Sequence, residues 1–361
     1  MTECRGWTWR ALAPLAIVCA VLLSPVTAMA SAASATAGPG GHGPHRFITV
    51  MTQNMDEGTD FTPLFTAATP AEFVAAASAI LQEVIASDIP ARAQLMADEI
   101  TAAAPDAVVL QEATIWTWQP PTGPASADLL GDLESALAAD GAHYAPAAVL
   151  NEASGAAPVP GFGTVSFQDR DAILVRTDEP PGHLRVANVQ SGHYATQLTL
   201  PTAVGPVTIL RGWISADATT RGRTVRVITT HLESASPVVQ QAQASELLAG
   251  PASTSLPVII AGDLNTGPLA AGGFLTPTYQ NILASGFTDA WTVTNPGVPG
   301  LTNAFHAEDP YGPSVPDKRI DLVLVNGNLR PVSLTLTGTS AVNGLWPSDH
   351  AGVIATIQIP S

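Results

Sequence analysis

Residues 258–268 (VIIAGDLNTGP) form an apolar run that ends abruptly in a carboxylate and an amide. The apolar residues Val258–Ala261 are typical of a strand that is buried on both faces. Side chains alternate along a strand, so Asp263 and Asn265 can face the same side at its end. Open α/β sheets gather their ligand-binding groups at such strand ends. The run therefore predicts a buried strand whose end contributes to a polar site.

Other apolar runs are also flanked by polar groups. Gln111 and Glu112 follow residues 107–110, and Ser348-Asp349-His350 precedes residues 352–359. The full set of such groups is Asn54, Asp56, Glu112, His231, Asp263, Asn265, Asp321, Asp349 and His350. Carboxylates that converge in a buried site repel one another unless a divalent cation lies among them. Oxygen ligands without a thiol suit Mg²⁺, Mn²⁺ or Ca²⁺.

Strand and helix patterns are interspersed along the chain. Thr69 and Glu72 form a capping box with Pro70 at the first helical position, which predicts a helix from Thr69 to about Ser87. Further helices are predicted from Pro90 to before Pro105, from a Ser126 cap to Gly141, over 236–250 and near 279–284. Predicted strands cover 46–53, 107–110, 172–176, 197–200, 207–214, 225–230, 320–325, 332–337 and 352–359, and residues 151–165 are predicted to be a mobile loop. The pattern favours α/β layers with a mixed sheet.

The first thirty residues have the pattern of a secretory signal peptide. Arg5 and Arg10 precede an apolar stretch at 11–26, and Ala28-Met29-Ala30 is a small-x-small cleavage site. Residues 31–45 are rich in Ala, Ser, Gly and Pro, as in a flexible linker, and 46–361 form the remaining domain. No further apolar segment is long enough to span a bilayer. We therefore expect a secreted protein with no stable membrane span after cleavage.

Cysteine content and charge narrow the class of protein. Both cysteines, Cys4 and Cys19, lie in the predicted signal peptide, so the exported domain is held by its core or by bound metal rather than by disulfides. The formal net charge is −16. Such a charge disfavours non-specific binding to a duplex backbone, which depends on Lys and Arg. It does not exclude a nuclease whose cations screen the phosphates.

Six short segments, taken in order, carry a resemblance to a known superfamily. They are Asn54-x-Asp56, Gln111-Glu112, Thr230-His231-Leu232, Gly262-Asp263-Leu264-Asn265, Arg319-Ile320-Asp321 and Ser348-Asp349-His350. This ordered set, spread from about residue 47 to 359, resembles the endonuclease/exonuclease/phosphatase superfamily, which includes DNase I-like nucleases and neutral sphingomyelinases. The resemblance implies a DNase I-like α/β fold: a four-layer sandwich of two mixed β-sheets flanked by helices, with the site at one edge.

The resemblance also implies a metal site. Glu112 would be the principal ligand of Mg²⁺, or of Mn²⁺ or Ca²⁺. Asp56 and Asp349 would assist it directly or through water. We expect the cation to neutralise charge on a phosphate ester during hydrolysis.

Catalytic roles are implied for six more residues. Asp263 would orient and activate the attacking water, and Asn54 and Asn265 would hold phosphate oxygens or the nucleophile. His350, oriented by Asp321, would donate a hydrogen bond to the non-bridging oxygens. His231 would be a second imidazole near the leaving group, although a lone histidine in such a position is more often structural.

Two features depart from the superfamily pattern. Residues 58–90 look like an insertion between Asn54 and Glu112. The Tyr or Arg that often contacts phosphate in the middle of the chain has no clear counterpart. Arg170 is one candidate, and the pair His193 and Tyr194 is another.

The sequence thus predicts a secreted, divalent-metal-dependent phosphoric ester hydrolase acting by water attack on a phosphodiester. Its expected partner is a phosphate ester, either nucleic acid or a phospholipid head group, and no protein partner is inferred. A nuclease is the first option, and a sphingomyelinase-like lipid phosphodiesterase or a phosphomonoesterase is the alternative. A non-catalytic binding module and a structural surface protein are rivals from other classes. Trp116 and Trp118 could contact bases or lipid, or could simply anchor a loop.

Overall fold

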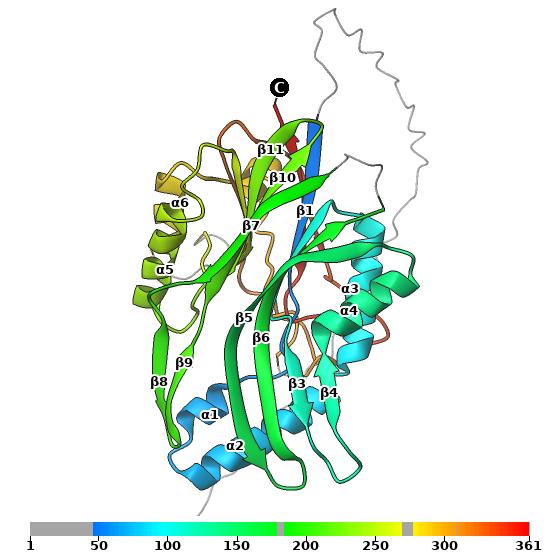
Figure 1. Ribbon diagram of the computed structural model, residues 1–361, viewed down its shortest axis with the longest axis vertical. Helices are drawn as coiled ribbons and strands as arrows, with labels where there is room; N and C mark the ends of the chain where they lie inside the picture. The colour runs from blue at the N-terminus through cyan, green and yellow to red at the C-terminus, as the bar shows by residue number, and fades with distance from the viewer. Residues whose placement is uncertain (1–45, 179–183, 269–276, 308, 361) are drawn as a thin grey trace, which may run out of the picture. The chain divides into compact units, whose positions relative to one another are not determined.

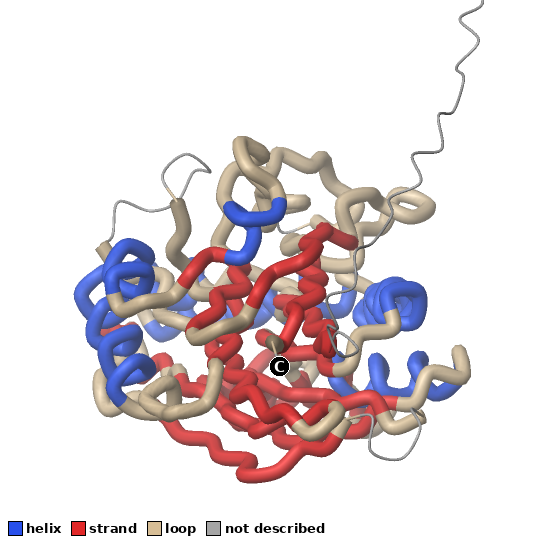
Figure 2. Tube along the Cα trace, turned by 90° about the horizontal axis from the view of Figure 1, so that it is seen from above, coloured by secondary structure: helices blue, strands red, loops and turns tan. Residues whose placement is uncertain are grey.

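The computed structural model describes residues 46–178, 184–268, 277–307 and 309–360. The predicted signal peptide (1–30) and linker (31–45) lie outside the described residues. The described chain forms two mixed sheets whose inner faces pack together, as Figures 1 and 2 show. Helices cover the outer face of each sheet.

The first sheet has eight strands in the order β15-β16-β1-β2-β6-β3-β4, with β5 paired to β6. They are β1 (Arg46–Asn54), β2 (Ala107–Gln111), β3 (Ile115–Trp118), β4 (Ala125–Asp128), β5 (Tyr144–Val159), β6 (Gly163–Arg176), β15 (Arg330–Thr337) and β16 (Gly352–Ile359). Strands β1 and β2 run parallel, whereas β1 and β16 run antiparallel. The parallel pair brings the carboxyl ends of β1 and β2 to the same edge of this sheet.

The second sheet has six strands in the order β13-β14-β12-β11-β10-β7. They are β7 (Arg185–His193), β10 (Gly212–Thr220), β11 (Arg223–His231), β12 (Val258–Asp263), β13 (Thr288–Asp289) and β14 (Asp321–Asn326). Strands β11 and β12 run parallel, and β14 runs antiparallel to β12. A separate two-stranded hairpin consists of β8 (Leu198–Thr202) and β9 (Gly205–Ile209).

Three apolar clusters connect these layers. Val50 and Val109 of the first sheet pack against Ile259 and Val323 of the second in the central cluster. On the outer face of the first sheet lie α2 (Pro70–Ala86), α3 (Ile89–Ala103) and α4 (Leu129–Ala139). On the outer face of the second lie α5 (Pro237–Ala249) and α6 (Thr278–Ala284). The predicted four-layer α/β sandwich is confirmed.

The residues predicted to start a helix at Thr69 do cap α2. The Thr69 side chain accepts a hydrogen bond from the Glu72 amide, so Thr69 caps α2 as predicted, and Glu72 Oε2 accepts from the amide of Ala68, one residue before the N-cap. Within the described part of the chain, no single helix is long and apolar enough to cross a bilayer. Helices α2 and α3 meet that test only when taken together, across a bend of 49°.

Two predictions of local structure were wrong. Residues 151–165 are not a loop but the turn end of the hairpin formed by β5 and β6. Pro158 is tolerated because β5 pairs only with β6, and Pro160 and Gly161 form the turn. Ser126 lies in β4 rather than at a helix cap. The cap of α4 is Asp128, whose side chain accepts a hydrogen bond from the Gly131 amide.

A third prediction joined two elements. Residues 207–214 were predicted to be one strand but contain the end of β9 and the start of β10, separated at Leu210 and Arg211. Two short elements complete the described fold, α1 (Thr62–Thr66) and α7 (Ala290–Thr294). Helices α1 and α2 both lie within the predicted insertion at 58–90.

Candidate functional site

Strand register brings the polar groups of both sheets to one edge of the sandwich. In the second sheet, His231 pairs with Asp263 across β11 and β12, and Asp263 pairs with Asp321 across β12 and β14. In the first sheet, Asn54 at the end of β1 pairs with Gln111 at the end of β2, so Glu112 follows beside it. Parallel neighbours share their carboxyl-end edge, which explains why segments so far apart in sequence meet here.

Asn54 connects the two sheets at this edge. Its Nδ2 donates to Glu112 Oε1 at 2.9 Å and to Asp263 Oδ2 at 3.1 Å. Its Oδ1 accepts a hydrogen bond from the Asp56 amide. Asn54 is fully buried, and Asp263 is 1% exposed. The two carboxylates are therefore held at fixed positions by one amide side chain.

The backbone at three of these residues adopts a left-handed conformation. The φ angles are 58° at Asp56, 54° at Glu112 and 48° at Asn265. Asn and Asp tolerate this region better than other non-glycine residues, whereas a glutamate does so at a cost of order 1 kcal/mol or more. The turn after β2 keeps the Glu112 carboxylate at the site, where Oε2 accepts a hydrogen bond from the Glu57 amide.

An imidazole and a carboxylate form the second part of the site. His350 Nδ1 donates to Asp321 Oδ2 at 2.7 Å, and its Nε2 lies 3.9 Å from Asp263 Oδ2. Burial lowers the pKa of His350, but the carboxylates of Asp321, Asp349 and Asp263 outweigh it and hold the pKa well above the usual value. The ring is therefore an imidazolium at neutral pH, with Nε2–H available to an oxygen acceptor. The Asn303 side-chain amide lies 3.0 Å from Nε2, and beside a charged ring its oxygen is the atom that can accept from Nε2–H.

A second imidazole, His231, is neutral. Burial lowers the pKa of His231 well below its usual value, and the positive charge of Arg211 lowers it further. Arg211 Nη1 lies 2.8 Å from Nδ1, and Asn265 Nδ2 lies 3.1 Å from Nε2. A neutral ring has one acceptor nitrogen, and a guanidinium can only donate, so Nδ1 accepts from Arg211 and the proton is on Nε2. Asn265 Nδ2 then donates to the Leu232 carbonyl and only contacts Nε2, because a protonated Nε2 accepts no hydrogen bond. That proton faces Asp263, whose Oδ2 lies 3.5 Å from Nε2.

Burial makes the site carboxylates weak acids. The pKa of Glu112 is raised to about 8 by burial and by the neighbouring Asp349 and Asp169 carboxylates. The pKa of Asp263 is raised to about 6 by burial and by Asp321, against the lowering effect of His350. Burial also raises the pKa of Asp349. Mutual repulsion of this kind is relieved by a cation among the carboxylates.

Asp56 lies beside the site in an ion-paired arrangement. Its Oδ2 is 3.0 Å from Arg92 Nη2 and 3.2 Å from His306 Nε2, and its Oδ1 accepts from the Gly58 amide. Burial opposes ionisation, but Arg92 and His306 outweigh it and lower the pKa of Asp56 to about 2. Its role as a metal ligand stays a prediction.

The middle-chain candidates for phosphate contact are engaged by other partners. Arg170 forms an ion pair with Asp128 and donates to the Ala113 and Thr114 carbonyls. The exposed His193 contacts the Asn151 carbonyl, and the buried Tyr194 hydroxyl bonds Thr230. None of these interactions points to the carboxylates described above.

Five residues at or next to the site were not singled out from the sequence: Glu57, Arg92, Arg211, Asn303 and His306. Arg211 lies between β9 and β10 and reaches His231 and Asp169 with one nitrogen. No short motif marks these positions, because each acts through a contact with a residue far away in sequence.

The donor set fits a divalent cation. Ligand atoms of Glu112, His231 and Asp263 lie within 4.8 Å of one another, as do those of Asp263, Asp321 and His350. Because Nε2 of His231 carries its proton, and His350 is engaged by Asp321, the carboxylate oxygens are the available ligands. Oxygen ligands without a thiol fit Mg²⁺, Mn²⁺ or Ca²⁺.

A two-sheet α/β sandwich with paired imidazoles and carboxylates at one edge defines a phosphoesterase-type scaffold. The chain belongs to the Endonuclease/Exonuclease/phosphatase family, whose model matches residues 74–350. Asn54 and Asp56 precede the matched region. The predicted family resemblance is confirmed, and members of this family are hydrolases that act on phosphoester bonds.

Solved structures of low sequence identity share the fold. An endonuclease/exonuclease/phosphatase family protein from Bacteroides thetaiotaomicron aligns with a TM-score of 0.56 at 15% identity, covering 88% of this chain and 100% of that one. D. rerio TDP2 complexed with single-strand DNA product aligns with a TM-score of 0.53 at 16% identity, covering 87% of this chain and 99% of that one. The mannosyl-6-phosphatase Bt3783 of B. thetaiotaomicron VPI-5482 aligns with a TM-score of 0.54 at 15% identity, covering 86% of this chain and 99% of that one. No match was found among curated proteins.

Proposed function

We propose that this protein is a divalent-metal-dependent hydrolase that cleaves a phosphate ester by attack of water. The observation that carries the proposal is the contact of one buried amide, Asn54, with both Glu112 and Asp263. Two imidazoles in opposite protonation states, His231 and His350, lie beside these carboxylates. A structural role alone does not require buried acids to converge in this way.

Glu112 and Asp349, whose charge raises the pKa of Glu112 and which lines the same cavity, are the residues that would hold the cation, with Mg²⁺ and Mn²⁺ as the preferred choices. When bound, a divalent cation supplies charge neutralisation for the phosphoryl oxygens and lowers the pKa of water. Glu112 is oriented for this role by Asn54 and by the Glu57 amide.

Asp263 would act as the general base. Its Oδ1 accepts a hydrogen bond from the backbone N–H of Asn265 at 2.9 Å, and its Oδ2 accepts one from the side-chain amide of Asn54. These bonds fix the direction of the carboxylate. Its pKa of about 6 lies close to neutral pH, which favours proton transfer from water.

The two imidazoles would donate hydrogen bonds to the phosphate. Nε2–H of His350 is charged, because Asp321 stabilises the imidazolium, and it would bind a non-bridging oxygen as negative charge grows. Nε2–H of His231 is neutral and would bind near the leaving group. Arg211 holds it in that tautomer.

Measurements on the purified protein test the proposal. Wild-type protein should hydrolyse bis(p-nitrophenyl) phosphate or p-nitrophenyl phosphate with Mn²⁺ or Mg²⁺ and lose activity with a chelator. Glu112→Gln and Asp263→Asn should each lower kcat/KM by about a hundredfold or more without changing the circular dichroism spectrum. Asp98→Asn, at an exposed position of α3, is the control. Full activity of Asp263→Asn would refute its role as base.

We also propose that the protein is exported with cleavage after Ala30. The charged start, apolar stretch and small residues before Ser31 support this. N-terminal sequencing of protein recovered from the culture medium tests it. A protein retained in the cell with Met1 intact would contradict export.

A further inference from the structure

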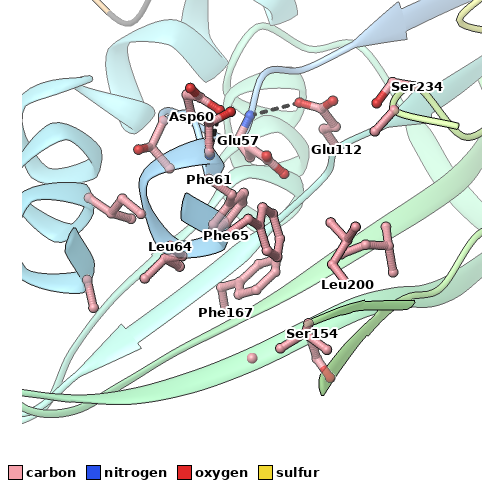
Figure 3. Close-up of a pocket in the computed structure, with 18 of the residues that line it drawn as sticks. Glu57, Asp60, Phe61, Leu64, Phe65, Glu112, Ser154, Phe167, Leu200 and Ser234 are labelled. Atoms are coloured by element: carbon pink, nitrogen blue, oxygen red, sulfur yellow. Dashed lines mark hydrogen bonds between the residues drawn. The ribbon is translucent and has the colours of Figure 1, made fainter. Parts of the chain in front are cut away.

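A cavity of about 580 Å³ opens beside the candidate site and has two chemically different ends. Glu57, Glu112 and Asp349 line one end. Apolar side chains of α1, β3, β6 and the β8–β9 hairpin line the other. Figure 3 shows Glu57 and Glu112 on one side of the aromatic residues Phe61, Phe65 and Phe167. The volume is that of a typical small-ligand site.

Aromatic rings form one wall of the apolar end. Phe61 stacks on Trp116 with ring centroids 5.7 Å apart and planes inclined by 15°, and Phe167 lies 4.6 Å from Phe61. The Trp116 indole also donates to the Glu57 carbonyl, which joins this wall to the acidic end. Phe61 and Phe65 come from the predicted insertion, and α1 itself contains no buried residue. The insertion thus supplies apolar surface to the cavity.

The β8–β9 hairpin forms the facing wall. Its strands pair with no other strand in the described fold, and β8 lies against α1 (Figure 1). The partly buried Leu200 and Ile209 line the cavity, whereas the exposed Thr199 and Thr208 bond each other on the opposite face. Among the described residues, neither Leu200 nor Ile209 belongs to any of the three buried clusters. An isolated two-stranded hairpin is marginally stable, so its apolar face is suited to an apolar ligand.

The charges that line the cavity favour a substrate with a single phosphate over a polyanion. Arg211 is the only Lys or Arg among the described residues that line it, and it is already shared by Asp169 and His231. The lining carboxylates include Asp60 and Glu233 in addition to the acids at the polar end. A polyanion needs several cationic contacts, which this surface does not provide. A single phosphate attached to a hydrocarbon chain matches both ends.

We propose that the cavity binds the hydrocarbon chain of the substrate, so that the phosphate ester hydrolysed at Glu112 and Asp263 is an amphiphile carrying an alkyl or acyl chain. This inference rests on the proposed hydrolytic function. The phosphate lies at the acidic end with the cation, and the chain runs between the aromatic wall and the hairpin. Leu200 and Ile209 are specificity-determining residues because they contact the chain and not the reacting atoms.

A chain-length series tests the proposal. Alkyl p-nitrophenyl phosphates from methyl to octyl, kept below their micelle concentrations, release the same leaving group. Wild-type kcat/KM should rise with chain length by up to about fourfold for each buried methylene. Leu200→Asn should lower kcat/KM for the octyl ester by about tenfold or more and leave the methyl ester unchanged. Thr199→Asn, on the outer face of the same strand, should change neither.

A second substitution guards against misfolding of the hairpin. Leu200→Trp keeps the apolar surface but fills the cavity, and should also abolish the preference for the octyl ester. Equal kcat/KM for methyl and octyl esters in the wild type would overturn the proposal. So would faster cleavage of a single-stranded oligonucleotide than of every ester, or an equal loss on both esters in Leu200→Asn.

Binding separates this inference from the hydrolytic proposal. Calorimetric titration with non-hydrolysable butyl and octyl phosphonates, in the presence of Mn²⁺, needs no turnover. Tighter binding of the octyl compound in the wild type but not in Leu200→Asn would support the chain site, even if no ester were hydrolysed. Equal affinity for both compounds would overturn it.

Discussion

His350 and Asp321 form a hydrogen bond of 2.7 Å that joins the two sheets of the sandwich. Asp321 begins β14 of the second sheet, and His350 lies two residues before β16 of the first. The contact places a charged donor, His350 Nε2–H, at the shared edge of the sheets. It also makes the protonation state of the donor depend on correct packing of one sheet on the other.

Asp321→Asn should therefore shift the pH dependence of activity. Asp321 raises the pKa of His350, so its removal lowers that pKa and the imidazolium loses its proton at a lower pH. We expect kcat/KM to fall by about a hundredfold at neutral pH and its alkaline limb to move to lower pH. The full pH profile of kcat/KM measures both effects. An unchanged alkaline limb with reduced activity would show that Asp321 acts only in folding.

Metal binding should be linked to proton release. The pKa of Glu112 is about 8 without a cation, so this carboxyl is mostly protonated at pH 7 and must ionise to bind metal. Between the usual pKa near 4.5 and about 8, Mn²⁺ affinity should rise with pH. Calorimetry at pH 7 in buffers of different ionisation enthalpy measures the protons released. Glu112→Gln should bind weakly and release fewer protons, and equal release would contradict this assignment.

Arg92 should be required for stability. Its side chain is fully buried, with Nη2 3.0 Å from Asp56 Oδ2 and Nε donating to the Pro347 carbonyl. Arg92→Met leaves the buried Asp56 carboxylate with only His306 as a charged partner, and should lower the free energy of unfolding by about 3–5 kcal/mol. Urea denaturation measures this loss.

The double variant Asp56→Asn/Arg92→Met provides the control. It removes both charges and should be less destabilised than the sum of the single variants. Strictly additive losses would show that the two charges do not interact. Calorimetric titration of Asp56→Asn with Mn²⁺ separately tests its predicted role as a metal ligand.

Glu99 should make stability depend on pH away from the site. Burial raises its pKa from 4.5 to about 7. Between these values the unfolded chain ionises while the folded protein holds the proton, so stability falls as pH rises from about 4.5 to 7. Glu99→Gln cannot ionise, and should gain at most about 3 kcal/mol over the wild type at pH 8 and nothing below pH 4.5.

Thermal unfolding at pH 5 and pH 8 measures this difference. The matched control is Asp140→Asn, because Asp140 is exposed and is not among the groups that shift the pKa of Glu99. A gain that is the same at both pH values would exclude ionisation of Glu99 as its cause.

The tautomer of His231 is a further measurable property. Arg211 donates to Nδ1, so wild-type His231 should carry its proton on Nε2. Long-range ¹H–¹⁵N correlation spectra distinguish the two tautomers. In Arg211→Lys, which keeps the charge but not the planar guanidinium, a mixture of tautomers and lower kcat/KM are expected. A pure Nδ1–H tautomer in the wild type would contradict the assignment.

The sequence was most informative where local chemistry decides structure. The capping box at Thr69 and Glu72 and the apolar run that ends at Asp263 predicted a helix and a buried strand that the structure contains. It failed at 151–165, where prolines and glycines suggested a loop. There the pairing of β5 with β6 overrides local preference, because an edge strand tolerates proline.

The ordered motifs, from Asn54 to His350, were sufficient by themselves to give the family, the fold class and the list of polar strand ends, because each is a short pattern tied to the end of an apolar run. Only the tertiary structure decided that Arg92 and His306 engage Asp56, that Arg211 sets the tautomer of His231, and that the β8–β9 hairpin and α1 line one cavity. These contacts join residues distant in sequence and depend on strand register and on the packing of two sheets, which no local pattern encodes.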